Sequence, residues 1–330
     1  MAYTTIDDPE AYFQVRHFTG TGSSQAYTLD GDTDMQPDYI WFNCNNSEHP
    51  RMYDAVRGVQ KHLRTSGYWA EGTDGNGLTA FDSDGWTHGS GPEGNPSSVL
   101  ATAWCWKESA TAGFDIVSYT GNGTDDTDIS HNLSAVPKMI IVKNRDAADS
   151  WQVYHGANTA APETDYLILD TDVATADAAG RWSDEAPTSS VFTLGDGAEV
   201  NTDTEDYIAY CFAEKQGFSK FGSYTGNGNA DGTFIYTGFR PAWVMTKRTD
   251  STSSWHIYDN KRDTYNLVQS KAVANDAVTY ASGTEVDFVS NGVKIRGTGS
   301  DLNASGGSFI FAAFAEAPLV NSNGVPCNAR

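Results

Sequence analysis

The sequence lacks a long apolar run. None of its stretches approaches the roughly 18 consecutive apolar residues that a membrane-spanning helix needs. Residues 1–8 are polar and acidic, unlike the apolar centre of a secretory signal peptide. We therefore expect a protein without membrane insertion. If it works outside the cell that makes it, it leaves by lysis or inside a particle.

Cysteine is scarce, with four in 330 residues. Cys105 and Cys211 occupy matching places in two similar strands, and Ala313 stands at that place in a third. A thiol that alanine can replace is a small apolar side chain rather than half of a disulfide. The spacings are not those of a zinc site. The pattern predicts free thiols and synthesis in a reducing cytoplasm.

Positive charge is under-represented. Against 43 Asp and Glu stand 21 Lys and Arg, which gives a formal net charge of −22. A polyanion repels the phosphate backbone of nucleic acids and the surface of anionic membranes. The same charge discourages non-specific association of a protein present in many copies. We expect no nucleic-acid partner and a solvated acidic surface.

Runs of Ala, Leu, Glu and Lys at helical spacing are missing, whereas aromatic residues make up 12% of the chain. Instead, one pattern occurs three times. A Thr-Gly-x-Gly turn at residues 19–22, 120–123 and 225–228 follows a β-rich run and precedes a proline that opens an apolar strand. Each copy ends on another apolar strand that carries a terminal glutamate. The prolines are Pro37, Pro137 and Pro241, and the glutamates are Glu108, Glu214 and Glu316.

The second copy shows the strand pattern most clearly. Its apolar or alternating runs are residues 114–119, 129–133, 139–142, 151–154, 166–169, 191–194 and 207–212. Short strands separated by regular turn signals are typical of an antiparallel sandwich. We therefore expect an all-β protein with three tandem β-sandwich repeats of about 105 residues, at 1–112, 113–216 and 217–330. Short junctions predict closely packed copies.

Signatures of catalysis are weak. There is no Gly-x-Ser-x-Gly elbow, and the seven histidines lack zinc spacing, so we interpret them as structural. The recurring Glu108, Glu214 and Glu316 are expected to cap the sheet or to pair with Lys143 or Lys247. Since a binding surface gains from triplication and a reaction centre does not, we predict no enzyme, no catalytic residue and no metal site. A carboxylate pair of the glycosidase type stays open as an alternative.

Two acidic turns, at residues 30–34 and 124–128, resemble calcium loops only in part. At the first, Trp41 stands where an EF-hand would place its bidentate glutamate. We interpret both turns as solvated surface and expect no cofactor, with a loosely bound Ca²⁺ as the alternative.

The nine tryptophans divide into two groups. Trp41, Trp104 and Trp243 lie in apolar strands and are predicted to be core. Trp69, Trp86 and Trp182 lie in polar segments flanked by Gly or Ser, and are candidates for exposed rings that stack on a sugar. The alternative is a loop tryptophan that folds back over the sandwich.

Several runs resemble a repeated virion-protein domain of tailed phages from marine and cyanobacterial hosts. These are residues 217–228, 236–244 and 247–250 in the third copy, 138–145, 186–192 and 206–214 in the second, 54–58 and 78–85 in the first, and 303–309 and 327–330 near the end. The resemblance covers nearly the whole chain. It implies a lectin-like (concanavalin-like or jelly-roll) β-sandwich in a tail-fibre or virion structural protein, and it carries no catalytic residues over.

Three functions follow as hypotheses. The first is a virion protein, in a tail fibre or on the particle surface, that attaches to host-surface glycan. The second is a capsid decoration, cement or head-fibre protein, which predicts an extended arm at residues 1–10 docked on another subunit. The third is a polysaccharide depolymerase. The expected partners are other virion proteins, a homo-oligomer with the trimer favoured, and host glycan. The expected location is the virion, assembled in the host cytoplasm and released by lysis.

Overall fold

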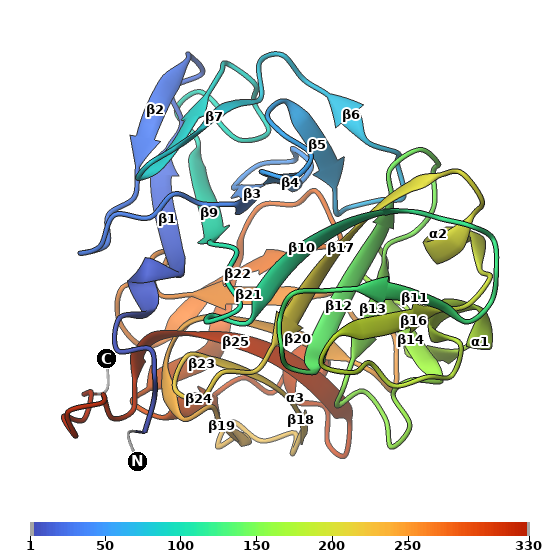
Figure 1. The fold of residues 1–330 in the computed structure, drawn as a ribbon. Helices are drawn as coiled ribbons and strands as arrows, with labels where there is room; N and C mark the ends of the chain where they lie inside the picture. The colour runs from blue at the N-terminus through green and yellow to red at the C-terminus, as the bar shows by residue number, and fades with distance from the viewer. Residues whose placement is uncertain (1–2, 329–330) are drawn as a thin grey trace.

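The strands expected from the sequence form antiparallel sheets (Figure 1). The structure is a computed structural model that describes residues 3–328. Its helices are short pieces: the 3-10 turn η1 (Pro9–Ala11) and the α-helices α1 (Ala179–Trp182), α2 (Ala198–Asn201) and α3 (Ser300–Asn303). The protein is all-β, as the composition predicts.

We name three segments by the predicted boundaries, which themselves stay a prediction. The first, residues 1–112, holds β1 (Phe13–Thr19), β2 (Gln25–Thr28), β3 (Tyr39–Cys44), β4 (Arg51–Asp54), β5 (Lys61–Arg64), β6 (Gly72–Thr73), β7 (Leu78–Asp82), β8 (Gly85–His88) and β9 (Leu100–Trp106). The second, residues 113–216, holds β10 (Phe114–Thr120), β11 (Thr127–Ser130), β12 (Pro137–Asn144), β13 (Gln152–His155), β14 (Asp165–Ile168), β15 (Ala176–Asp177), β16 (Val191–Leu194) and β17 (Asp206–Ala213). The third, residues 217–330, holds β18 (Ser219–Thr225), β19 (Phe234–Tyr236), β20 (Phe239–Arg248), β21 (His256–Asp259), β22 (Val268–Val273), β23 (Ala281–Val289), β24 (Gly292–Ile295) and β25 (Ser308–Pro318).

The main sheet of each segment begins with the same strand order. The first strand pairs with the last, and the last pairs with the strand that follows the proline: β1-β9-β3-β4, β10-β17-β12-β13 and β18-β25-β20-β21. The run at 139–142 has no alternation because its strand, β12, lies inside the sheet between β17 and β13.

A smaller sheet accompanies the main sheet in the first two segments. It consists of β2, β8 and β7 in the first and of β11 and β16 in the second. One apolar cluster lies within the first segment and includes Tyr53 and Trp86, and another lies within the second and includes Tyr207 and Trp182. In the third segment the sheet continues through β22, β23 and β24 to β19, and β23 and β24 pack against β20.

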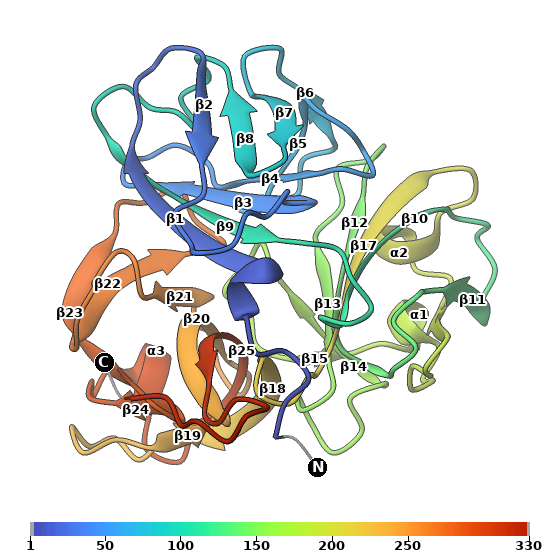
Figure 2. The same ribbon diagram turned by 60° about the vertical axis from the view of Figure 1, so that its left-hand side comes forward.

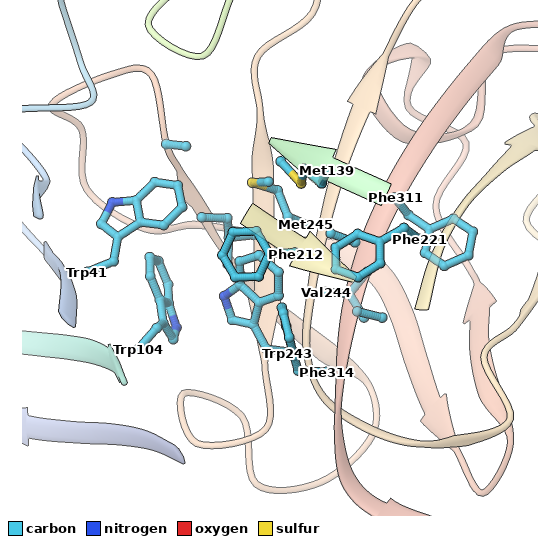
Figure 3. Close-up of a cluster of buried hydrophobic side chains, with 14 of the residues drawn as sticks. Trp41, Trp104, Met139, Phe212, Phe221, Trp243, Val244, Met245, Phe311 and Phe314 are labelled. Atoms are coloured by element: carbon cyan, nitrogen blue, oxygen red, sulfur yellow. The ribbon is translucent and has the colours of Figure 1, made fainter. Parts of the chain in front are cut away.

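The largest apolar cluster takes side chains from all three segments (Figure 3). Trp106, Phe212 and Phe314, from the last strand of each segment, meet there with Trp41 and Trp243. The ring centroid of Trp106 lies 5.5 Å from the ring centroid of Phe314 and 6.4 Å from that of Phe212. The prediction that Trp41 and Trp243 are core is confirmed, at 2% exposure each. The segments thus share one core.

Figure 2 shows the three segments as blocks of colour around the centre of the molecule, and polar contacts link these segments in a closed cycle. Each contact involves the last residue of one of three matching strands, which is Asp54 in β4, His155 in β13 and Asp259 in β21. The contacts run from the Tyr210 hydroxyl to Asp54 (2.8 Å), from His155 Nε2 to the Phe311 carbonyl (3.1 Å) and from Trp104 Nε1 to Asp259 (3.0 Å). The first segment therefore joins the second, the second the third and the third the first.

The Thr-Gly-x-Gly turns need both of their glycines. The second glycine has a positive φ each time, +64° at Gly22, +65° at Gly123 and +67° at Gly228. At the first glycine a Cβ would collide with a backbone carbonyl oxygen, for example 2.2 Å from that of Thr202 at Gly121. A positive φ explains the second glycine of each turn, and close backbone approach explains the first.

Residues 3–8 dock on the end of the second segment and on the third segment of the same chain. Thr4 Oγ1 donates to the Gln216 carbonyl at 2.8 Å, and Ile6 is 3% exposed within the shared core. Asp7 accepts a hydrogen bond from the backbone N–H of Ser322 at 2.6 Å, which ties this N-terminal segment to the turn that follows β25. The arm that the decoration hypothesis placed on another subunit is therefore folded back, as far as residues 3–10 show. Residues 1 and 2 lie outside the described part.

Candidate functional site: an exposed aromatic pair

The three tryptophans selected as sugar-stacking candidates have different surroundings. Trp86 is fully buried and stacks on Tyr27, with ring centroids 5.4 Å apart, and Trp182 is 2% exposed and meets the edge of Tyr154 at 6.0 Å. The prediction that these two rings are exposed was wrong. In β8, successive side chains point to opposite faces, so Trp86 is buried while its neighbour Thr87 faces outward. Polar neighbours in the sequence therefore do not show that a tryptophan lies in a surface loop.

Trp69 is exposed, as predicted. Its side chain is 39% exposed and that of Tyr68 is 56% exposed. The two rings lie nearly parallel, with centroids 6.2 Å apart and an angle of 14° between their planes. We call these two exposed rings the aromatic pair.

Polar groups border the aromatic pair. The Arg64 guanidinium lies 5.6 Å from the Trp69 ring centroid, and the His49 ring meets Trp69 edge-on at 4.9 Å. His49 Nδ1 is 2.8 Å from Ser66 Oγ. Burial and the charge of Arg64 lower the pKa of His49, so at neutral pH its ring is uncharged. Gly67 leaves room for Trp69, because a Cβ there would come within 2.5 Å of the indole ring.

Both ends of the loop that carries the pair are fixed to other segments. Before it, Thr65 Oγ1 donates to the Ala274 carbonyl at 2.6 Å, and the Arg64 carbonyl accepts from Trp151 Nε1 at 3.0 Å. After it, the Glu71 carboxylate accepts from Arg145 Nε at 2.9 Å. The second and third segments thus position a loop of the first, which preorganises the pair.

The strand-end glutamates do not pair with the lysines that the sequence suggested. Glu214 pairs with Lys220 at 2.7 Å and Glu316 with Arg240 at 3.2 Å, while Glu108 accepts the Ile116 N–H at 3.2 Å. Burial, with Asp115 beside it, raises the pKa of Glu108 to about 7.

The two lysines are instead buried and donate to backbone carbonyls. Lys143 Nζ lies 2.6 Å from the carbonyl of Asn144, and Lys247 Nζ lies 2.7 Å from that of Ser253. Desolvation lowers the pKa of each to about 8. The predicted pairing of these lysines with strand-end glutamates was wrong, because each ammonium group is buried and donates to backbone carbonyls of a nearby loop.

A second set of acids lies inside each segment and meets a cation. These pairs are Glu93 with Arg51, Glu199 with Arg181 (2.6 Å) and Asp301 with Lys271 (2.6 Å). Although burial acts to raise the pKa of Asp301, the hydrogen bond and charge of Lys271 lower it. A general acid needs a pKa near the working pH, whereas Asp301 is held ionised. These pairs therefore have the chemistry of structural links.

The acidic turns contain no metal cage in the structure. Asp30 pairs with Arg16 at 2.8 Å and with Lys261 at 3.0 Å, so cations of the chain itself occupy its carboxylate. Among residues 3–328 there is no group of three His, Cys, Asp or Glu side chains placed to hold a metal ion. In the same range, no helix has the length and apolar character to cross a membrane.

Sequence reasoning missed the residues that build the pair and its supports. Tyr68 stands beside Trp69 between two glycines, and this doublet was the available signal. Arg64 and His49 carried none, because His49 reaches the loop from another part of the chain.

It also missed Asn95, Asn201 and Asn303, which are fully buried and hold the three turns. Their common position, five residues before the last strand of each segment, is visible in the sequence.

Comparison with known proteins adds one relationship. No curated protein matches the chain. A family model described as a domain of unknown function (DUF7483) matches residues 8–318, across all three segments. The chain belongs to this DUF7483 family.

Proposed function

We propose that this protein is a non-enzymatic component of a phage virion, displayed on a tail fibre or on the particle surface, which binds host-surface glycan through Tyr68 and Trp69. The resemblance of its sequence to repeated virion proteins motivates the setting. The observation that carries the binding role is the exposed aromatic pair on a loop fixed at both ends.

The chemistry of the pair suits a sugar. Exposed aromatic rings offer a flat apolar face of the kind on which the C–H face of a pyranose packs, and such contacts are favourable when water is displaced from both surfaces. The Arg64 guanidinium lies over the Trp69 ring and the His49 ring meets it edge-on, so both bring hydrogen-bonding groups next to the rings. Because a monovalent site of this size binds weakly, display in many copies, or as a homotrimer, would raise the apparent affinity by about 10² to 10⁴.

A glycan array and host polysaccharide, probed with the purified protein, test the proposal. We expect saturable binding that Trp69→Ala weakens about tenfold, since losing a stacking ring removes about 1 kcal/mol or more. Tyr265→Ala, which removes a 79% exposed ring elsewhere, is the matched control and should bind like the wild type.

The absence of binding to every glycan at high protein concentration would contradict the proposal. So would equal binding by Trp69→Ala. The same polysaccharide, sized after incubation with the protein, should keep its length, whereas shortening would favour the depolymerase.

A further inference from the structure

A hollow lies where the N-terminal residues cross the junction between the second and third segments. It is an open hollow of about 270 Å³, close to the lower end of the range of about 300 to 1,000 Å³ that ligand sites occupy. Tyr3 and Tyr236 form aromatic walls, and Glu214, Gln216 and Lys220 bring polar groups. It lies near β18 and β19, at the opposite end of the molecule from β5 and β6, which flank the aromatic pair (Figures 1 and 2).

Two glycines in the wall of this cavity, Gly217 and Gly238, let the backbone come close to the N-terminal residues. Tyr3 Oη donates to the Gly238 carbonyl at 2.7 Å, and a Cβ on Gly238 would lie only 2.7 Å from that hydroxyl oxygen. At Gly217, a Cβ would lie 2.8 Å from the Cβ of Thr4. Both glycines also have positive φ, +82° and +78°. The backbone is therefore shaped to hold Tyr3 at the rim, which makes the cavity a built feature of the fold.

The lining offers an apolar face together with donors and acceptors. Tyr236 is 53% exposed, so its ring is available for stacking, and its hydroxyl lies 3.5 Å from that of Tyr3. Glu214 Oε1 and Lys220 Nζ are 2.7 Å apart, and about a third of each side chain is exposed. A carboxylate accepts hydrogen bonds from hydroxyls and an ammonium donates to them. Gln216 is exposed and can do both.

The charges at the cavity select the class of ligand. Glu214 and Lys220 neutralise each other, so the lining favours neither sign, and the net charge of −22 disfavours an anion. A ligand with many hydroxyls and an apolar ring face matches phenol rings beside a balanced ion pair. We propose that this cavity is a binding site for a neutral saccharide, separate from the aromatic pair and independent of it.

Saturation-transfer NMR and calorimetric titration with maltose, lactose and N,N′-diacetylchitobiose test this site. We expect at least one of these sugars to bind with a millimolar Kd, and Tyr236→Ala to weaken that binding roughly tenfold. Tyr236→Phe, which keeps the ring, should bind like the wild type. Trp69→Ala and the exposed control Tyr265→Ala should also leave the affinity unchanged. Because Tyr236 is half exposed, its substitution should preserve the fold, which the thermal unfolding midpoint would verify.

Two results would overturn the inference. One is no binding of any of the three sugars at about 20 mM, well above a millimolar Kd. The other is binding that Trp69→Ala abolishes and Tyr236→Ala leaves intact, which would assign the sugar to the aromatic pair. Loss of glycan binding at the aromatic pair alone would leave this site standing, so the two proposals fail separately.

Discussion

His155 is fully buried, and its two hydrogen bonds select one neutral form. Nε2 donates to the Phe311 carbonyl at 3.1 Å, and Nδ1 accepts from the Ala157 N–H at 3.2 Å. If Nδ1 were protonated, its N–H would face the Ala157 N–H, and two hydrogen-bond donors would point at each other. Burial accordingly lowers the pKa of His155 to about 4. In its neutral form the residue joins the second segment to the third through Nε2 and accepts from its own segment at Nδ1.

The histidine predicts a pH dependence. In the unfolded chain it takes up a proton near pH 6.5 and in the folded protein only near pH 4, so its contribution is present above pH 6.5 and is lost as the pH falls toward 4. Between pH 7 and 5 this one group should lower the free energy of unfolding by about 2 kcal/mol. Urea unfolding at both pH values measures it.

The control for this prediction is His155→Gln, which keeps a donor for Phe311 and removes the titration. It should lose less stability than the wild type over the same interval. Equal losses in the two proteins would contradict the assignment.

Single residues also show where the site could and could not be predicted. Trp69 and Trp86 have similar polar flanks in the sequence, yet only Trp69 is exposed. The difference arises because Trp86 lies in β8, which pairs with β2, a partner that is far away in sequence. Local composition carries no information about such a partner, so a tryptophan in a short strand and one in a loop look alike.

At the scale of elements, each Thr-Gly-x-Gly turn is held by one buried asparagine. Asn201 Oδ1 accepts from the Asn122 N–H at 2.9 Å, and its amide donates to the carbonyls of Thr124 (2.8 Å) and Gly195 (3.0 Å). Asn95 and Asn303 make the corresponding contacts at the other two turns. Short α2 and α3 end near these asparagines, so the asparagine and the turn act as one structural unit.

Asn201→Ala should destabilise the protein by about 2 to 4 kcal/mol. It removes the acceptor of the Asn122 N–H and the donor to the carbonyls of Thr124 and Gly195, at about 1 to 3 kcal/mol for each group that stays buried and unsatisfied. Chemical unfolding would measure this as a lower midpoint. Asn323→Ala, at an exposed position, should change the midpoint little, and equal effects of the two substitutions would refute the role given to Asn201.

The elements themselves were largely predictable. In the second segment the runs at 114–119, 139–142, 191–194 and 207–212 correspond to β10, β12, β16 and β17. Alternation, glycine and proline carry that information because they depend on neighbouring residues. Glu214 pairs with Lys220 at the start of β18 and not with Lys143 of β12. That choice depends on how the ends of strands meet, which local pattern does not encode.

For the whole molecule, the central finding is that the three segments share one core and close on one another. Buried ion pairs strengthen one of the junctions: Asp54 and Arg57 are both fully buried, their side chains approach to 2.5 Å, and Tyr210 of the second segment donates to the same carboxylate. The close packing expected from the short junctions thus extends to a core that takes side chains from all three segments.

Asp54→Ala should cost about 3 kcal/mol of stability, because it removes the nearer buried partner of Arg57, which keeps its contact with Glu71 at 3.2 Å, and takes away the acceptor of the Tyr210 hydroxyl. Asp30→Ala removes a carboxylate from the half-exposed pairs with Arg16 and Lys261, and should cost at most about 1 kcal/mol. Thermal or urea unfolding of the two variants would compare them. A smaller effect for Asp54 than for Asp30 would contradict the role given to the buried pair.

The shared core also predicts cooperative unfolding. Scanning calorimetry should show a single transition for the whole chain, because no segment can unfold without exposing Trp106, Phe212 and Phe314 to water. Three transitions, or a stable isolated fragment of residues 1–112, would indicate independent domains.

The functional claim can be tested most directly on host cells. Fluorescently labelled protein is incubated with intact host cells, and bound protein is measured against concentration for the wild type, Trp69→Ala and Tyr265→Ala. The account predicts saturable binding by the wild type and by Tyr265→Ala, and a loss of about tenfold in affinity for Trp69→Ala. Equal binding by all three proteins, or no binding by the wild type, would contradict it.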